Sequence, residues 1–168
     1  MSSSPAARRI KDAYLELLAQ YPHGPITVTQ IAQKAQVNRV TFYRLFGTQE
    51  DVLLEILDEF DEGTRIELPE PNSEGRVGEI ARAPLEHHRE NAGMLRTVLL
   101  SSMAPVLEKR IEQGIREPTA GYFSENRMLG EFYVAGTARV ICSWIKNGCR
   151  ESVDELLEVF SAARVQLR

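Results

Sequence analysis

The sequence predicts an all-α protein, and two observations support this fold class. Apolar residues recur three or four positions apart along most of the chain, which is the spacing of amphipathic helices. The alternation of β-branched and polar residues that is typical of strands is nearly missing, whereas Leu, Ala, Glu and Arg are plentiful. With 168 residues, 43% of them hydrophobic, the chain can bury a full core. We therefore expect a small N-terminal helical module joined to a larger helical body.

The first helix is predicted to begin after Ser4, an N-cap residue. Pro5 then occupies the first helical position, where its missing N–H has no effect on the hydrogen bonding of the helix. Apolar residues from Ile10 to Tyr21 follow helical spacing and form one stripe. Pro22 and the Gly and Pro that follow it end the helix.

Two short helices joined by a tight turn are predicted next. Thr27 begins the first of them, and Gln30, three residues later, completes a capping box. Asn38 caps the second, which spans residues 39–45, so the turn falls at residues 36–37. The apolar side chains expected to face inward are Ile31, Ala32, Ala35, Val37, Phe42 and Phe46. A helix, a turn and a helix of this kind form a helix-turn-helix unit.

The body begins with a helix that restarts at Thr48. Residues 68–75, LPEPNSEG, are expected to form a loop, and a helix over residues 76–91 follows, with a kink at Pro84. One or two shorter helices, interrupted near Pro105, are predicted for the next 25 residues, and residues 116–123 are expected to form an irregular link.

The last third of the chain is strongly apolar. One helix, which Gly148 closes, carries apolar or small residues around much of its circumference, and a capping box formed by Ser152 and Glu155 opens a final helix. Such wide apolar faces predict a four-helix interface with a second copy of the chain, and the alternative is that they form the core of one subunit. The residues expected at the dimer interface are Phe132, Val140, Ile141, Trp144, Leu156 and Phe160.

Charge is unevenly distributed along the chain. Residues 1–50 contain six Lys or Arg and three Asp or Glu, which gives +3, so the other 118 residues sum to -7 within the total of -4. A basic head on an acidic body suits contact with a polyanion at one end only.

Several classes of protein are excluded or disfavoured. No segment approaches the roughly 18 apolar residues of a membrane span, and the N-terminus lacks the apolar core of a signal peptide. Cys142 and Cys149 lie about 10 Å apart along a predicted helix, too far for a disulfide. We therefore expect a cytoplasmic protein with reduced thiols, with a thiol-based redox switch as the alternative.

No catalytic constellation is visible in the sequence. No nucleophile with its base, phosphate-binding glycine loop or metalloprotease motif is found, so no enzyme activity, cofactor or metal is expected. His87 and His88 are adjacent, so on a helix their side chains point about 100° apart and cannot comfortably bind one ion. We expect them on an exposed polar face.

The helix-turn-helix unit has an outward face suited to DNA. In such units the second helix enters the major groove, and the side chains expected to project from it are Arg39, Val40, Tyr43 and Arg44. Arginine forms paired hydrogen bonds to guanine, an aliphatic side chain meets a thymine methyl, and the tyrosine hydroxyl suits a phosphate. Hydroxyl or amide groups at the helix starts also suit phosphates, and these belong to Thr27, Thr29, Asn38 and Thr41. The alternative is an ordinary helical hairpin with a polar face.

Residues 6–60 resemble the N-terminal domain of the TetR family of bacterial transcriptional repressors. The resemblance lies in ITVTQIAQKAQV followed by NRVTFYRLFGTQEDVL, after a helix that ends in ELLAQYP. It implies a homodimer that binds a palindromic operator, with a DNA-binding domain at residues 1–50 and an effector-binding and dimerisation domain at 51–168. Carried over by position, it makes the same eight side chains the DNA-facing set.

The C-terminal segment FYVAGTARVICSWIKNGCRESVDELLEVF is similar to a short branch of this family that includes regulators of dihydroxyacetone kinase operons.

A ligand pocket, where one exists, is expected inside the body, because flexible thioethers and aromatic rings accommodate small apolar molecules. The candidates to line it are Met94, Met103, Tyr122, Phe123 and Tyr133, and plain core packing is the alternative for each.

The sequence therefore predicts a DNA-binding transcriptional regulator, expected to be a repressor that a small-molecule effector releases. Its expected partners are double-stranded operator DNA and a second copy of itself. No contact with a membrane is expected. The sequence departs from the family pattern at Gln36, where the turn usually has glycine, at Leu45 and Gln49, which replace histidine and lysine, and at Thr29, where arginine is common. Gln36, Leu45 and Gln49 favour the alternative, a TetR-like adaptor for protein–protein contacts with a degenerate DNA-binding head.

Overall fold

The structure, a computed structural model, describes residues 4–62 and 77–166, and every regular element in these residues is a helix. The predicted all-α class is therefore confirmed. The predicted loop at residues 68–75 lies outside the described residues. Within the described ranges, no helix is both long enough and apolar enough to cross a membrane.

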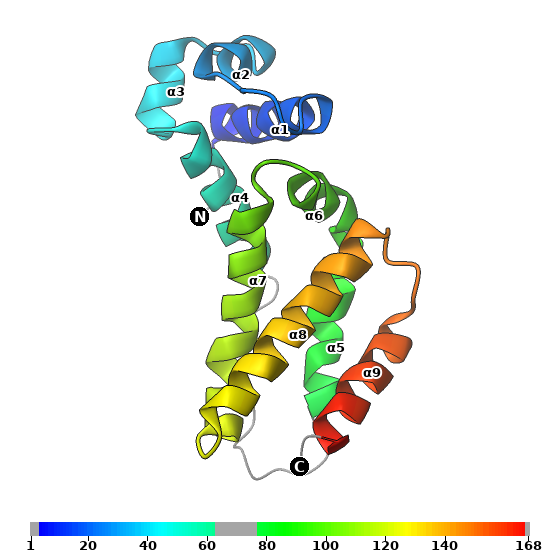
Figure 1. The fold of residues 1–168 in the computed structure, drawn as a ribbon. Helices are drawn as coiled ribbons and strands as arrows, with labels where there is room; N and C mark the ends of the chain where they lie inside the picture. The colour runs from blue at the N-terminus through cyan, green and yellow to red at the C-terminus, as the bar shows by residue number, and fades with distance from the viewer. Residues whose placement is uncertain (1–3, 63–76, 167–168) are drawn as a thin grey trace.

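Helices α1 (Pro5–Gln20), α2 (Val28–Lys34) and α3 (Arg39–Leu45) form a head at one end of the molecule (Figure 1). Helix α4 (Gln49–Glu62) leaves this head and runs toward the rest of the chain. The expected boundary between the two domains, at residues 50–51, falls inside α4. One continuous helix therefore connects the two parts.

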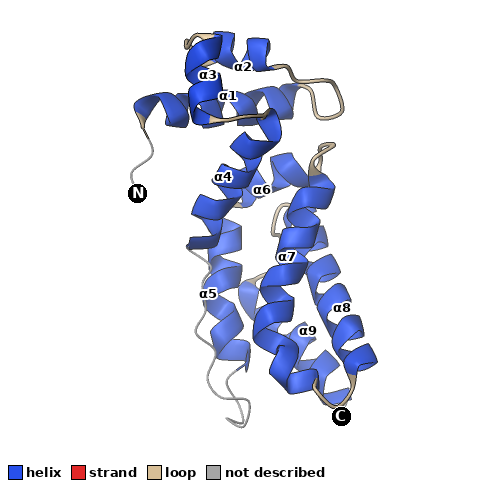
Figure 2. Ribbon diagram, turned by 90° about the vertical axis from the view of Figure 1, so that its left-hand side faces the viewer, coloured by secondary structure: helices blue, strands red, loops and turns tan. Residues whose placement is uncertain are grey.

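The remaining helices form the body. They are α5 (Val77–Glu90), α6 (Ala92–Leu99), α7 (Ala104–Thr119), the short 3-10 helix η1 (Ala120–Phe123), α8 (Arg127–Lys146) and α9 (Val153–Gln166). Figure 2 shows that α5 and α7 follow the long axis of the body, and α6 lies at the end next to the head, where it packs against α1. The predicted interruption near Pro105 lies between α6 and α7, and Pro105 is the second residue of α7.

Local capping places the head helices where the sequence predicts them. Ser4 Oγ accepts a hydrogen bond from the N–H three residues later at 3.2 Å, and Asn38 Oδ1 does the same at 2.7 Å. Both hydrogen bonds of the predicted capping box between Thr27 and Gln30 are formed. Because each cap acts within one helical turn, the sequence alone is enough to locate these helix starts.

The same arrangement recurs in the body. Thr48 and Asp51 exchange the hydrogen bonds of a capping box just before α4, and Ser152 and Glu155 do so before α9. Helix α8 ends at Lys146, two residues before the Gly148 that was predicted to close it, and the φ of +80° at Gly148 favours glycine. The predicted starts of α4 and α9 are confirmed.

The predicted irregular link at residues 116–123 is instead helical. Helix α7 continues through Pro118, and the chain then passes into η1. Proline removes a single backbone hydrogen bond from a helix. Side-chain contacts between α7 and α8 hold the end of α7 in place next to Pro118. Arg116 on α7 forms a salt bridge to Glu131 on α8 at 2.6 Å. Helix α5 likewise spans Pro84.

A continuous apolar core runs from the head into the body. It includes the almost completely buried Tyr14 of α1, Leu57 of α4 and Leu95 of α6. Helix α1 packs against both α4 and α6. A hydrogen bond of 2.8 Å from Ser102 N–H to the Pro22 carbonyl also joins the loop after α1 to the link before α7. Head and body are therefore packed against each other and share one core.

The prediction that His87 and His88 lie on an exposed face is wrong. His88 is 8% exposed, and its Nδ1 lies 2.6 Å from the Pro84 carbonyl oxygen. Both rings pack against Phe60 at the C-terminal end of α4, with centroid distances of 4.8 Å for His87 and 5.1 Å for His88. Burial lowers the pKa of His88, because the charged ring loses its solvation. The long-range packing of α5, which no local pattern reveals, covers this face.

Candidate nucleic-acid interface

The turn between α2 and α3 is built from backbone hydrogen bonds and one left-handed residue. Val37 N–H donates to the Ala32 carbonyl at 2.9 Å, which closes the end of α2. Gln36, between them, has a φ of +53°. A non-glycine residue therefore adopts the left-handed conformation at the position where the family pattern has glycine. The turn is therefore strained by the side chain that replaces glycine.

Helix α1 braces this turn. Arg9 Nε donates a hydrogen bond of 3.2 Å to the carbonyl of Ala35, the C-cap residue of α2. In the sequence, Arg9 is recognisable only as one of the six basic residues among residues 1–50. The contact joins residues 26 positions apart, so no local pattern could have indicated it.

The outward face of α3 presents four side chains together. Val40 is 77% exposed and Tyr43 is 50% exposed, and Arg39 and Arg44 are also exposed. Phe42, on the opposite side, has no exposed surface. The separation of inward and outward residues that the sequence predicts for this helix is therefore present in the structure.

Polar side chains at the starts of α2 and α3 already form hydrogen bonds within the protein. Thr27 Oγ1 lies 2.8 Å from Gln30 Oε1, and Asn38 Oδ1 accepts its hydrogen bond from Thr41 N–H. Thr41 is partly buried, whereas Thr29 is exposed. Thr27 and Asn38 therefore shape the starts of α2 and α3, in addition to any contact they make with a ligand.

Charge on the head is partly neutralised within the molecule. Lys34 on α2 pairs with Glu16 on α1 at 2.6 Å, and Lys11 on α1 pairs with carboxylates of α4. Over residues 4–62 and 77–166, neither Arg39 nor Arg44 forms a salt bridge. The guanidinium groups of α3 therefore remain available to an external anion.

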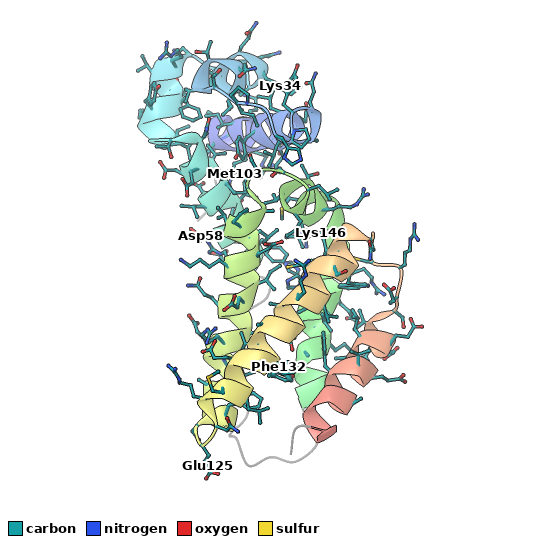
Figure 3. All side chains as sticks on the ribbon, viewed as in Figure 1. Lys34, Asp58, Met103, Glu125, Phe132 and Lys146 are labelled. Atoms are coloured by element: carbon teal, nitrogen blue, oxygen red, sulfur yellow. The ribbon has the colours of Figure 1, made fainter. Side chains whose placement is uncertain are left out.

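Helix α4 is held on two sides by ion pairs. Toward the head, the buried Lys11 contacts Glu55 at 3.4 Å and also contacts Glu59. Toward the body, Arg110 on α7 bridges two further carboxylates of α4, those of Asp58 and Asp61 (Figure 3 labels Asp58). These contacts fix the direction in which α4 leaves the head and enters the body.

The side chains proposed to line a ligand pocket do not gather at one place. Met103 lies at the head end of α7 (Figure 3), whereas Phe123 follows the other end of this 16-residue helix, about 24 Å away. The rings of Phe123 and Tyr133 contact each other, with centroids 5.1 Å apart, and Met94 packs against the main core. The side chain of Tyr122 lies outside the described residues.

Most of the side chains expected at a dimer interface are buried inside the subunit. These are Ile141, Trp144, Leu156 and Phe160. Helix α9 packs against α5, and Trp144 Nε1 donates a hydrogen bond of 2.9 Å to the Glu151 carbonyl. The core alternative that the sequence left open therefore describes these four residues. Val140 is partly buried.

Other apolar side chains of α8 and α9 do face outward. Phe132 is 67% exposed and Met128, one turn earlier, is 71% exposed. Val159 on α9 is 53% exposed. Exposed large apolar side chains on adjacent turns of one helix mark a candidate contact surface, which we call the α8 patch and define as Met128 and Phe132.

The two cysteines lie in different environments. Cys142 is buried in α8, and burial raises the pKa of its thiol to about 11. Cys149 lies beyond the end of α8, not on it as predicted, and partial burial raises its pKa too. Both thiols therefore stay protonated near neutral pH, which opposes the redox-switch alternative.

A strained tight turn, an exposed basic face on the second helix and a helical body define a protein of the helix-turn-helix class. Residues 10–56 match the family model of the bacterial regulatory proteins of the tetR family. Residues 10–56 of this chain are therefore similar to a domain of the tetR family, and the chain as a whole has the same fold as solved transcriptional regulators.

Solved structures of three regulators resemble the whole chain. The fatty acid degradation regulator FadR from Bacillus halodurans is 22% identical with a TM-score of 0.59, and the match covers 99% of this chain and 97% of that one. A TetR-like transcriptional regulator from Rhodococcus sp. RHA1 is 14% identical with a TM-score of 0.58, covering 97% and 95%. The dihydroxyacetone kinase operon activator DhaS is 19% identical with a TM-score of 0.52, covering 96% and 93%. No curated protein matches the chain.

Proposed function

We propose that this protein is a transcriptional regulator that binds a palindromic operator as a homodimer. In this proposal it acts in the cytoplasm as a repressor, and a small-molecule effector releases it from DNA. The observation that best supports DNA binding is the outward face of α3. There, two exposed arginines without carboxylate partners among the described residues flank Val40 and Tyr43.

Each side chain of this face has a proposed role. Arg39 and Arg44 would each read one base pair, because guanidinium groups pair with guanine O6 and N7. Val40, the most exposed apolar side chain of the helix, would contact a thymine methyl. The Tyr43 hydroxyl would bind a phosphate, together with Thr27, Thr29, Asn38 and Thr41 at the helix starts.

DNA binding is tested by titrating labelled duplexes from the protein's own upstream region at several salt concentrations. We expect an affinity that falls steeply with salt, because bound phosphates release counterions. Arg44→Ala should relax preference at one base pair by about 1–3 kcal/mol. Lys109→Ala, an exposed cation on the body, is the matched control and should leave binding unchanged. Salt-independent or absent binding to every duplex would favour the adaptor alternative.

The homodimer is supported by the α8 patch and by symmetry. A two-fold axis would bring the two α3 helices to about 34–36 Å, one turn of the duplex, and a palindromic operator matches that symmetry. Two large side chains with 71% and 67% exposure on one helix are also a liability in a monomer, and a second copy would cover them.

Light scattering after size-exclusion chromatography tests the dimer. We expect Phe132→Glu to shift the protein toward the monomer, because it places a charge in an apolar contact. Leu100→Glu, at an apolar residue 45% exposed between α6 and α7, is the matched control and should stay dimeric. A wild-type monomer at every concentration would contradict the homodimer and leave DNA binding to be judged separately.

Release by an effector is supported by the shared core of head and body. A compound that binds among the body helices would act on α4, whose two sets of ion pairs join both parts. Binding reciprocity provides the test, because a true effector must lose affinity for the operator-bound protein by the same factor by which it weakens operator binding. Compounds that raise the melting temperature of the protein but leave operator affinity unchanged would contradict the release mechanism.

A further inference from the structure

Arg39 and Tyr43 lie one turn apart on the outward face of α3. The guanidinium carbon of Arg39 is 5.9 Å from the centroid of the Tyr43 ring. That distance lies within the range of a cation–π contact, and side chains four positions apart on a helix are neighbours. The guanidinium group therefore lies over the face of the ring.

The Tyr43 ring is itself anchored on the core. Its centroid is 5.7 Å from that of Phe42, and the two planes meet at 88°, an edge-to-face contact. Phe42 has no exposed surface and contacts Phe46 at a centroid distance of 5.9 Å. The contact with a buried neighbour restricts the Tyr43 ring more than a free surface tyrosine is restricted.

Arg39 has little else to hold it. It is the first residue of α3, where the positive end of the helix dipole disfavours a cation. The ion pairs among residues 4–62 and 77–166 do not include it. Without the ring, the long side chain would sample many rotamers, and fixing one of them on binding would cost entropy.

We infer that Tyr43 is a positioning residue for Arg39. Its ring holds the guanidinium group in the orientation in which Arg39 reads its base pair. The inference deepens the proposed function and rests on it. It divides Tyr43 into two parts: the hydroxyl binds phosphate and affects all sequences alike, whereas the ring sets the base preference of its neighbour.

The experiment begins with duplexes that the wild-type protein selects from a randomised library. The selected duplex and all its single-base-pair substitutions are then titrated by fluorescence anisotropy. Arg39→Ala identifies the base pair that Arg39 reads. Tyr43→Phe removes only the hydroxyl, and Tyr43→Leu also removes the ring face while keeping an apolar contact with Phe42. Circular dichroism checks that each variant is folded.

We expect Tyr43→Leu to reduce the preference at that base pair by about 2- to 5-fold, the factor that corresponds to an exposed cation–π contact. Tyr43→Phe should keep the preference and weaken binding to every probe equally. Combined with Arg39→Ala, Tyr43→Leu should cause no further loss of preference at that pair. Arg44→Ala is the matched control, and its effect on its own base pair should be independent of Tyr43.

Two results would overturn the inference while leaving DNA binding intact. One is an unchanged preference in Tyr43→Leu, and the other is a loss in Tyr43→Phe as large as that in Tyr43→Leu. A wild-type protein that enriches no sequence from the library would overturn the inference and the proposed function together. The two failures are therefore distinguishable in one data set.

Discussion

The ammonium nitrogen of Lys11 on α1 lies 2.5 Å from a carboxylate oxygen of Glu59 on α4, although only 7% of the Lys11 side chain is exposed. The carboxylate partners of Lys11 keep part of their hydration, because Glu55 is 43% exposed and Glu59 is 49% exposed. The pair therefore places a buried cation between the head and the helix that leads to the body.

Removing the two carboxylates should destabilise the protein more than removing the cation. The double variant Glu55→Gln and Glu59→Gln leaves Lys11 buried without a counter-charge, and we expect a loss of about 1–3 kcal/mol in the free energy of unfolding. Lys11→Met keeps the volume and removes the charge, so we expect a loss below about 1 kcal/mol. Urea unfolding measures both. An equal or larger loss in Lys11→Met would contradict this account of the pair.

Gln36→Gly should stabilise the protein. The left-handed backbone at this residue is strained for glutamine and not for glycine, so we expect a gain of about 0.5–1 kcal/mol in thermal or urea unfolding. Gln33→Gly, an exposed position inside α2 on the same hairpin, is the matched control. It should lose about 0.5–1 kcal/mol, since glycine weakens a helix interior. The opposite sign at either residue would refute the prediction.

Arg110→Gln should loosen the attachment of α4 to the body. The side chain is 26% exposed and bridges Asp58 and Asp61, so we expect a loss of about 1 kcal/mol in the free energy of unfolding. Lys109→Gln alters an exposed neighbour on the same helix and should change stability by less than about 0.5 kcal/mol. The difference between the two variants should shrink at about 1 M salt, which screens exposed charges. A salt-independent difference would point to lost packing instead.

Acidification should destabilise the protein through His88. Burial lowers the pKa of this ring below its ordinary 6.5, so the unfolded chain binds a proton that the folded chain resists. Its contribution to stability is complete above pH 6.5 and is lost as the pH falls from there through the folded-state pKa. The melting temperature should therefore drop less between pH 7.5 and 5.5 in His88→Gln than in the wild type. His23→Gln, at an exposed histidine, is the control and should follow the wild type.

Cys142 should react slowly with a thiol reagent. Its thiol is buried, and a pKa of about 11 leaves little thiolate at pH 8. A Cys149→Ser variant isolates Cys142, and we expect labelling with a chromogenic disulfide to become fast only after unfolding in urea. Rapid labelling of the folded variant would revive the redox-switch alternative.

The features that sequence reasoning located are those encoded within one helical turn. The starts of α2 and α3 follow from Thr27 with Gln30 and from Asn38, because a cap and its partner lie three residues apart. The inward position of Phe42 and the outward position of Val40 follow from helical spacing. The left-handed backbone of Gln36 lies where the family pattern has glycine, so the resemblance marked the position of the turn.

The features that it did not locate depend on contacts between distant segments. Arg9 braces a carbonyl 26 residues away, and Lys11 finds its partners 44 and 48 residues along the chain. Trp144 looks like an interface residue because its helix is apolar all round, yet it is buried inside the subunit and its indole N–H donates to the Glu151 carbonyl. Apolar periodicity shows that a face is buried and does not show which partner buries it.

The two-sided attachment of α4 has a consequence for protein engineering. A chimaera that exchanges DNA-binding modules between related regulators is naturally cut at residue 50, shortly after α3 ends at Leu45 and just inside α4. That cut would leave Lys11 of the transplanted module facing a foreign helix, with no guarantee of a carboxylate at either contact position. Exchanging residues 4–62 as one cassette would keep those partners, and compensating changes would then be needed where the cassette meets the body, opposite Arg110, on α6 and at the two histidines that pack against Phe60.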